Sequence, residues 1–197
     1  MNMDKIKFVL ASKSPRRCEL LKNLGVDFEV SVSGADESKV PKDLPPQLYV
    51  QELAVIKGTS VAEQYKKGCY IIAADTVVVY DGEIIGKPKD SEDAKRMLSM
   101  FSGNTHRVYT GFSVTDAGSG KTVSDYEMTE VHFKELSDSE MDAYIASGEP
   151  FDKAGGYGIQ GRAGLFVDSI TGDFFNVVGL PLCKLNNLIK KEFDILL

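Results

Sequence analysis

Apolar residues follow two rhythms along the chain. An alternating or unbroken apolar pattern, typical of strands, predicts extended segments. These cover residues 5–10, 28–32, 70–80, 83–85, 107–115, 122–133, 165–170 and 174–178. Apolar positions three and four residues apart predict amphipathic helices. These cover residues 14–24, 46–65, 90–101 and 137–146, with a last helix starting at Pro181.

Turn and cap residues mark where these elements begin and end. Asp81-Gly82 predicts a tight hairpin. Residues 137–140, Ser-Asp-Ser-Glu, fit a capping box at a helix start. Residues 171–173, Thr-Gly-Asp, predict a further hairpin that joins 165–170 to 174–178. Gly58 is expected to bend or interrupt the helix over 46–65, because glycine is a poor helix former.

Hairpins interspersed with helices indicate an α/β protein of the mixed α+β kind, not a regular βαβ array. We expect a mixed β-sheet flanked by helices. The chain has no internal repeat and no clean linker, so the 197 residues are expected to form a single domain, 1–197.

Charge and composition narrow the function. The net charge is −6 and the pI is near 5.0, which disfavours long DNA or RNA as a partner. With 43% hydrophobic residues, the chain can bury a sizeable core. No apolar run approaches the ~20 residues of a membrane span, and the N-terminus has no signal-peptide pattern. Three scattered cysteines predict neither a disulfide framework nor a metal site and suit a cytoplasmic location.

The segment 11–17, Ala-Ser-Lys-Ser-Pro-Arg-Arg, lies between a strand and a helix. Ser14 fits the N-cap and Pro15 the first helical position. Arg16 and Arg17 then fall in the first turn, where the helix dipole disfavours cations. Backbone N–H groups and two guanidinium groups at this place suit a phosphate chain. The alternative is two solvated arginines on a surface helix.

Asp75 lies inside the apolar run over 70–80. A carboxylate there is costly unless it is paired or binds a metal, although an Asp bonded to loop N–H groups at a strand end is the structural alternative. Thr76 points to the opposite face of the strand. Glu37, in the loop after the second strand, could join Asp75 at a Mg²⁺ ion, or be a solvated loop residue.

Three lysines and a glutamine stand out: Lys57 lies near the inward face of the helix over 46–65, and Lys87, Lys153 and Gln160 lie beside turns and glycines. Lys57, Lys87 and Lys153 could form a phosphate cradle with the two arginines, although a single lysine is more often just solvated. Residues 155–161, Gly-Gly-Tyr-Gly-Ile-Gln-Gly, allow close backbone approach, and the Gln160 amide suits the edge of a base. A flexible turn with a surface glutamine is the alternative. The two histidines, His106 and His132, are expected to be structural or exposed.

Six ordered segments resemble the Maf family of nucleoside triphosphate pyrophosphatases. They are Leu-Ala-Ser-Lys-Ser-Pro-Arg-Arg at 10–17, Ala-Asp-Thr-Val at 74–77, Gly-Lys-Pro at 86–88, Ser-Gly-Asn-Thr-His at 102–106, Asp-Lys-Ala-Gly-Gly-Tyr-Gly-Ile-Gln-Gly at 152–161 and Val-Gly-Leu-Pro at 178–181. The resemblance covers nearly the whole chain. It implies a strongly twisted mixed sheet in two lobes with a central cleft, similar to the inosine triphosphate pyrophosphatases. It also implies cleavage of a nucleoside triphosphate to the monophosphate and pyrophosphate.

The same resemblance assigns roles by position. Asp75 matches the catalytic acid and, with Glu37, the metal position for Mg²⁺, Mn²⁺ or Co²⁺. The positions that match phosphate binding are Ser12, Arg16, Arg17, Lys57, Lys87 and Lys153, and those associated with substrate choice are Arg16, Thr76 and Gln160. The glutamine at 160 is similar to the subgroup that acts on dTTP and UTP.

The resemblance further implies a homodimer and a role in nucleotide house-cleaning and septum formation. Two alternatives remain open: a non-catalytic nucleotide-binding regulator of cell division, and a pyrophosphatase for modified purine nucleotides such as 7-methyl-GTP.

Overall fold

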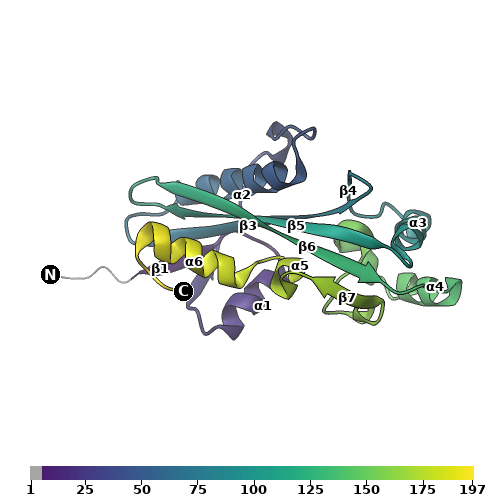
Figure 1. Cartoon of the computed structure of the whole chain (residues 1–197). Coiled ribbons are helices and arrows are strands. Elements are labelled where there is room, and N and C mark those ends of the chain that lie inside the picture. Colours follow the sequence, from purple (N-terminus) through teal and green to yellow (C-terminus); the bar gives the residue numbers. More distant parts are fainter. Residues whose placement is uncertain (1–5) are drawn as a thin grey trace. The chain divides into compact units, whose positions relative to one another are not determined.

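One mixed sheet of seven strands organises the computed structural model, which describes residues 6–197 (Figure 1). The strand order is β2-β1-β3-β5-β6-β7, and β4 pairs with β3. The strands are β1 (Lys7–Leu10), β2 (Phe28–Val30), β3 (Cys69–Tyr80), β4 (Glu83–Ile85), β5 (Thr105–Asp116), β6 (Thr122–Phe133) and β7 (Val167–Thr171). The mixed α/β class is thereby confirmed. Lys5, where the first strand was expected to begin, lies outside the described residues.

Both parallel and antiparallel pairs occur in the sheet. β1 lies between β2 and β3 and is parallel to each. Parallel neighbours need crossover connections, and these contain the helices α1 (Pro15–Asn23) and α2 (Pro46–Ala62). β4 is antiparallel to β3, and β7 is antiparallel to β6.

The chain divides into two compact units. The first contains the described residues up to Asp75 together with 110–127 and 179–197, and the second contains 76–109 and 128–178. The expected single domain over 1–197 and the central cleft both stay predictions.

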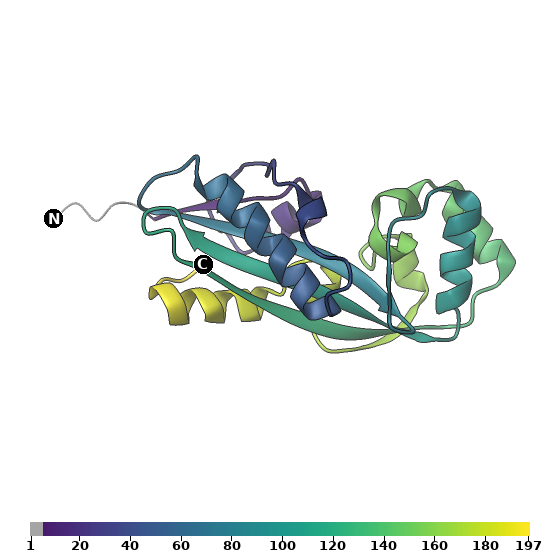
Figure 2. The ribbon, with the colours of Figure 1, turned by 90° about the horizontal axis from the view of Figure 1, so that it is seen from above.

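In the first unit, α2 covers one face of the strands and α6 (Leu182–Phe193) lies on the other (Figures 1 and 2). α2 continues through Gly58 without a break, so the expected interruption there is wrong. The glycine serves close packing instead, because a Cβ at Gly58 would lie 2.9 Å from Ser113 Oγ on β5. On the other face, the ring of Phe193 packs edge-on against Tyr70 of β3.

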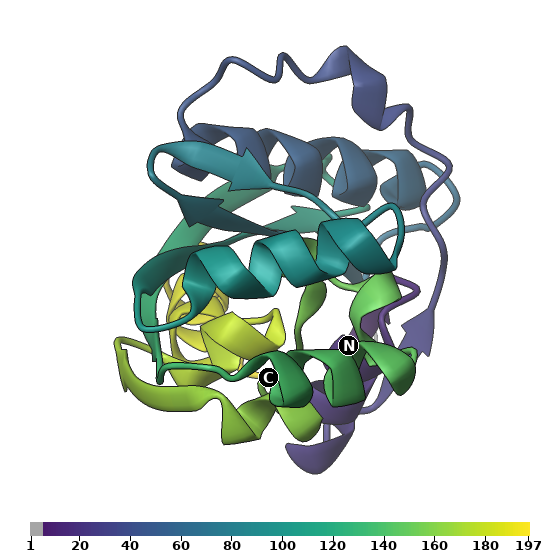
Figure 3. The same cartoon turned by 90° about the vertical axis from the view of Figure 1, so that its right-hand side faces the viewer.

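In the second unit, α3 (Ser91–Phe101) and α4 (Asp138–Ala146) lie side by side (Figure 3). Lys95 of α3 bridges to Asp142 of α4 at 2.8 Å. The core beneath them is rich in aromatic rings, with Phe101 and Phe133 fully buried. Within residues 6–197, no helix combines the length and the apolarity that crossing a bilayer requires.

The helix caps predicted for α1 and α4 are confirmed. The Ser14 side chain caps α1, with Pro15 at the first helical position, and Asp90 caps α3. Ser137 and Glu140 form the complete capping box of α4. The β3–β4 turn has positive φ at both central residues, 50° at Asp81 and 82° at Gly82, as a tight hairpin of this kind requires.

The hairpin predicted around residues 171–173 is wrong in its second half, because residues 174–178 form the short helix α5 (Phe174–Val178). The Asp173 carboxylate accepts from Phe175 N at 2.7 Å and so starts a helical turn. The Asn176 amide then donates to Val108 O at 3.0 Å and to Thr129 Oγ1 at 2.9 Å, which holds the turn against the sheet. A five-residue apolar run cannot be told from a strand by periodicity alone.

The glycine-rich stretch after α4 forms three short 3-10 helices, η2 (Glu149–Asp152), η3 (Ala154–Gly156) and η4 (Arg162–Leu165). The long loop before α2 contains a fourth, η1 (Glu37–Lys39).

Candidate active site

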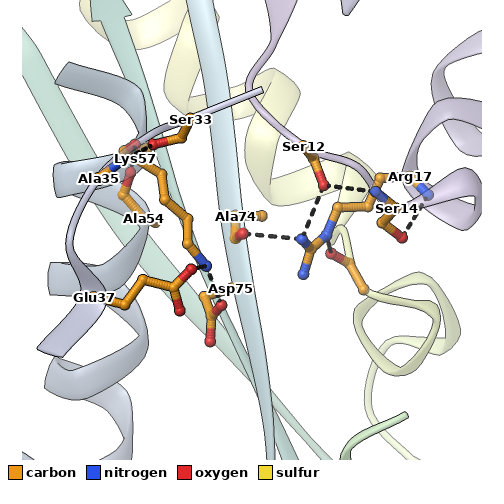
Figure 4. A network of polar contacts seen from close by, with 12 residues as sticks. Ser12, Ser14, Arg17, Ser33, Ala35, Glu37, Ala54, Lys57, Ala74 and Asp75 are labelled. Atoms are coloured by element: carbon orange, nitrogen blue, oxygen red, sulfur yellow. Dashed lines mark hydrogen bonds and ion pairs between the residues drawn. The ribbon is translucent and has the colours of Figure 1, made fainter. Parts of the chain in front are cut away.

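Asp75 lies at the middle of β3, and its carboxylate faces Lys57 from α2 (Figure 4). Lys57 Nζ donates to Asp75 Oδ1 at 2.5 Å. The two side chains are only 14% and 19% exposed, so neither charge is fully hydrated. The costly strand carboxylate therefore has its compensating partner, as the sequence pattern required.

Glu37 reaches the same lysine from η1 (Figure 4). Its Oε1 lies 3.2 Å from Lys57 Nζ, and its side chain is 57% exposed. η1 is positioned locally by Asp36, whose carboxylate accepts from Ser38 N at 3.1 Å. Two carboxylates from distant parts of the chain thus share one ammonium group, an arrangement that the sequence could not show.

This pair of carboxylates fits a divalent cation. Mg²⁺ is usually held by one or two carboxylates, with waters and substrate phosphates completing its shell. Glu37 and Asp75 already converge on one cationic atom, Lys57 Nζ. In the part of the chain that the structure describes, no group of three or more His, Cys, Asp or Glu side chains forms a metal cage. A metal here would therefore depend on water and phosphate oxygens for its remaining ligands.

Arg17 lies beside this cluster and is held by the backbone. Its Nε donates to Gly179 O at 2.7 Å, and its Nη1 donates to Ala74 O at 2.9 Å. Nη1 also lies 3.3 Å from Ser12 Oγ (Figure 4). Burial lowers the pKa of the Arg17 guanidinium, the negative charge of Asp75 raises it, and the charge of Arg16 lowers it. Arg17, in the first turn of α1, therefore has a structural role that does not depend on any contact with phosphate.

Ser12 and Arg16 complete this side of the site. Ser12 is 8% exposed, and its Oγ accepts from Ser14 N at 3.1 Å, so it shapes the turn that leads into α1. Arg16 is half-buried in the first turn of α1. The first unit thus brings together Ser12, Arg16, Arg17, Glu37, Lys57 and Asp75.

The remaining predicted residues belong to the second unit. Thr76 continues β3, and Lys87 follows β4. The segment with Lys153 is fixed to the segment with Lys87, because Gly155 N donates to Gly86 O at 2.9 Å. Lys153 Nζ donates to Glu149 O at 2.7 Å and to Asp152 Oδ1 at 2.6 Å. Gln160 is exposed in the turn before η4. The roles of all these residues stay predictions.

His106 is structural, as expected. It is 1% exposed within the aromatic core, and its Nε2 lies 2.7 Å from the Tyr157 hydroxyl. Burial lowers its pKa to about 3, with a smaller contribution from the charge of His132. Glu149 is the residue that sequence reasoning missed. A glutamate before a proline gives no signal of its own, and only the folded chain shows that its carboxylate contacts the Gln160 turn.

The sequence over residues 7–192 matches the Maf-like protein family. The chain belongs to this family. It is 51% identical over 96% of its length to a dTTP/UTP pyrophosphatase of Alkaliphilus metalliredigens, covering 97% of that protein. It is 49% identical over 95% of its length to a dTTP/UTP pyrophosphatase of Bacillus cytotoxicus, covering 96% of it.

Among solved structures, a HAM1 protein from Coxiella burnetii gives a TM-score of 0.42 at 13% identity, over 65% of this chain and 73% of that chain. A likeness this distant adds nothing to the assignment, which rests on the Maf-like sequence match and the near-full-length relatives.

Proposed function

We propose that this Maf-family chain hydrolyses dTTP and UTP to the nucleoside monophosphate and pyrophosphate. Two relatives named as dTTP/UTP pyrophosphatases share about half of its residues over nearly their whole length. The observation that carries the proposal is the cluster at β3: a strand carboxylate, Asp75, held by Lys57 beside a second carboxylate, Glu37. A lone buried salt bridge would not need the second acid.

Asp75 is the proposed general base. Its carboxylate orients a water molecule and accepts its proton while the water oxygen attacks the α-phosphorus. The bond from the α-phosphorus to the bridging oxygen breaks, and pyrophosphate leaves with that oxygen. Phosphoryl transfer depends mostly on positioning and on neutralising charge. The proposed cationic groups for this are Arg16, Arg17, Lys57, Lys87 and Lys153, with Ser12 as a hydroxyl donor.

Glu37 and Asp75 would hold the divalent cation, Mg²⁺, Mn²⁺ or Co²⁺. When bound, such an ion offsets negative charge on phosphate oxygens. Arg16, Thr76 and Gln160 are the proposed selectors of a pyrimidine base, because a polar group left unpaired in a site penalises the wrong base. The proposal includes a homodimer in the cytoplasm, which size-exclusion chromatography with light scattering and cell fractionation would test.

Replacing Asp75 with Asn tests the central claim. Asn keeps the shape of the side chain but cannot accept the proton, so pyrophosphate release from dTTP and UTP should fall by orders of magnitude. Asp168, exposed on β7, offers a matched control, and Asp168→Asn should retain activity. Circular dichroism and thermal melting should show both variants folded. Wild-type release of pyrophosphate by a folded Asp75→Asn variant would refute the assigned role.

A panel of triphosphates incubated with the wild-type protein and Mn²⁺ separates the remaining alternatives. Products from dTTP and UTP support the proposal. Products mainly from purine triphosphates such as 7-methyl-GTP would replace the substrate assignment. Binding without any product would indicate a nucleotide-binding regulator instead of an enzyme.

A further inference from the structure

The turn that carries Gln160 is attached to the Glu149 carboxylate, which also accepts a hydrogen bond from the Tyr144 hydroxyl. Glu149 Oε2 accepts from Arg162 N at 3.2 Å, which fixes the end of the turn. Glu149 Oε1 accepts from the Tyr144 hydroxyl at 3.4 Å. An interaction with the backbone of Gly158, where the turn begins, lowers the pKa of the same hydroxyl, so the phenol lies beside that end of the turn. Residues 158–162 therefore form a turn whose end is bonded to a carboxylate and whose beginning lies beside a phenol.

Gly161 shows how closely the carboxylate approaches. A Cβ at this position would lie 2.0 Å from Glu149 Oε1 and 2.6 Å from Glu149 Cδ. Only glycine leaves room for the carboxylate directly beside Gln160. The turn is also closed on itself, since Gly161 N donates to Gly158 O at 3.0 Å.

Packing around Tyr144 and the backbone turn before Glu149 restrict the positions of both side chains. The Tyr144 ring is 2% exposed and packs edge-on against Phe166, with ring centroids 5.2 Å apart. Burial raises the pKa of the Tyr144 hydroxyl, and the charge of Glu149 raises it further, so it remains a protonated donor at neutral pH. Glu149 begins η2 directly after Gly148, which ends the α4 region in a left-handed conformation with φ of 75°.

We propose that Glu149 and Tyr144 are positioning residues for substrate selection, holding Gln160 where its amide can recognise a pyrimidine. This inference rests on the proposed function and deepens it. A glycine-rich turn on the surface has many conformations of similar energy, and an amide that discriminates bases needs a fixed direction. Glu149 and Tyr144 supply that direction without touching the substrate themselves.

The first experiment separates base recognition from phosphate recognition. Glu149→Ala should raise the KM for UTP and dTTP about tenfold, which corresponds to about 1.4 kcal/mol, with kcat within about twofold. The preference for dTTP over dGTP should narrow by a similar factor. Inhibition by inorganic tripolyphosphate, which has no base, should keep its wild-type constant. Glu149→Gln retains an acceptor oxygen and should recover most of the selectivity, and exposed Glu92 on α3 supplies the control Glu92→Gln.

A second set of variants guards against simple misfolding. Tyr144→Phe keeps the buried ring and removes only the hydroxyl, so it should reproduce the loss of selectivity with a smaller effect. Gly161→Ala should do the same by displacing the carboxylate. Its effect should nearly vanish in the Glu149→Ala background, because residues in contact are not additive.

Each outcome has a definite meaning. Wild-type selectivity in both Glu149→Ala and Tyr144→Phe would overturn the inference while leaving the proposed function intact. A parallel weakening of tripolyphosphate inhibition would also overturn it, because the effect would then be a general loss of structure. Absence of pyrophosphate release by the unchanged protein would overturn both proposals together.

Discussion

The contact between α2 and β5 allows a sharp test of how the first unit is built. Gly111 of β5 lies against the backbone of α2, where a Cβ would be 2.3 Å from Val50 C and 2.4 Å from Val50 O. Because these are main-chain atoms, no side-chain rotation can relieve the clash. Gly111→Ala should therefore push the whole helix away from the sheet.

The size of the effect follows from these distances. Carbon atoms pack best at about 3.5–4.0 Å, so the helix must move outward by about 1.2 Å or more to accept the methyl group. Overpacking of a well-filled core costs about 1–3 kcal/mol and sometimes more. Since backbone must move here, we expect a loss of about 3 kcal/mol in the free energy of unfolding. For a chain of this size that lowers Tm by roughly 6–12 °C.

Gly58 on α2 offers the matched comparison. A Cβ there would meet two hydroxyl oxygens, Ser113 Oγ at 2.9 Å and Thr115 Oγ1 at 3.3 Å. These side chains can rotate, although Ser113 would lose its 2.8 Å bond to Ala54 O, at a cost of about 1 kcal/mol. Alanine in a helix interior is favoured over glycine by about 1 kcal/mol. The two terms offset each other, so Gly58→Ala should change stability by less than about 1 kcal/mol.

Urea unfolding followed by circular dichroism measures both variants, and thermal melts provide a second readout. α2 also carries Lys57, so Gly111→Ala should lower pyrophosphate release as the lysine moves away from Asp75. A Gly111→Ala protein with wild-type Tm would refute the packing argument. So would a Gly58→Ala protein that is the less stable of the two.

Two further outcomes are expected. The unfolded chain binds a proton at His106 near pH 6.5, but the folded chain does so only near pH 3, so stability is complete above pH 6.5 and falls on acidification. Between these two pH values, the free energy of unfolding of the wild type, measured with urea, should fall by about 1.4 kcal/mol per pH unit more than that of His106→Gln. Equal slopes of unfolding free energy against pH for the two proteins would contradict the lowered pKa. Lys57→Met removes the ammonium that Glu37 and Asp75 share, so pyrophosphate release should drop about a hundredfold, whereas wild-type turnover would exclude Lys57 from the site.

Local chemistry was enough to predict much of this fold. The caps at Ser14, Asp90 and Ser137 act through side chains that bond to backbone within three residues, so sequence neighbours contain the whole signal. The same holds for the Asp81-Gly82 turn, whose positive φ values are a local property. By contrast, the helix over residues 174–178 is held against the sheet by Asn176, which bonds to Val108 and Thr129, residues that are distant in sequence.

The residues of the candidate site also divide into those that local sequence predicts and those that only the folded chain brings together. The sequence identified Asp75 because an unpaired carboxylate inside an apolar strand is energetically costly. It identified Lys57 because that residue lies on the inward face of a predicted helix. The contact of Glu37 with Lys57 depends on tertiary structure, because the sequence of a long loop does not determine where its central residues lie. Glu149 was not predicted for the same reason, because its contacts with Tyr144 and Arg162 form only when the chain folds.

The bonding of Arg17 affects how any mutation at this position must be interpreted. One planar guanidinium ties together three stretches of chain, near Ser12, Ala74 and Gly179, which are far apart in sequence. Lysine, a single point of charge on a flexible stem, cannot span those three directions. A substitution at Arg17 would remove these structural hydrogen bonds and a positive charge at the same time. A loss of turnover in such a variant therefore indicates a catalytic role only if a separate measurement shows that the protein is still folded.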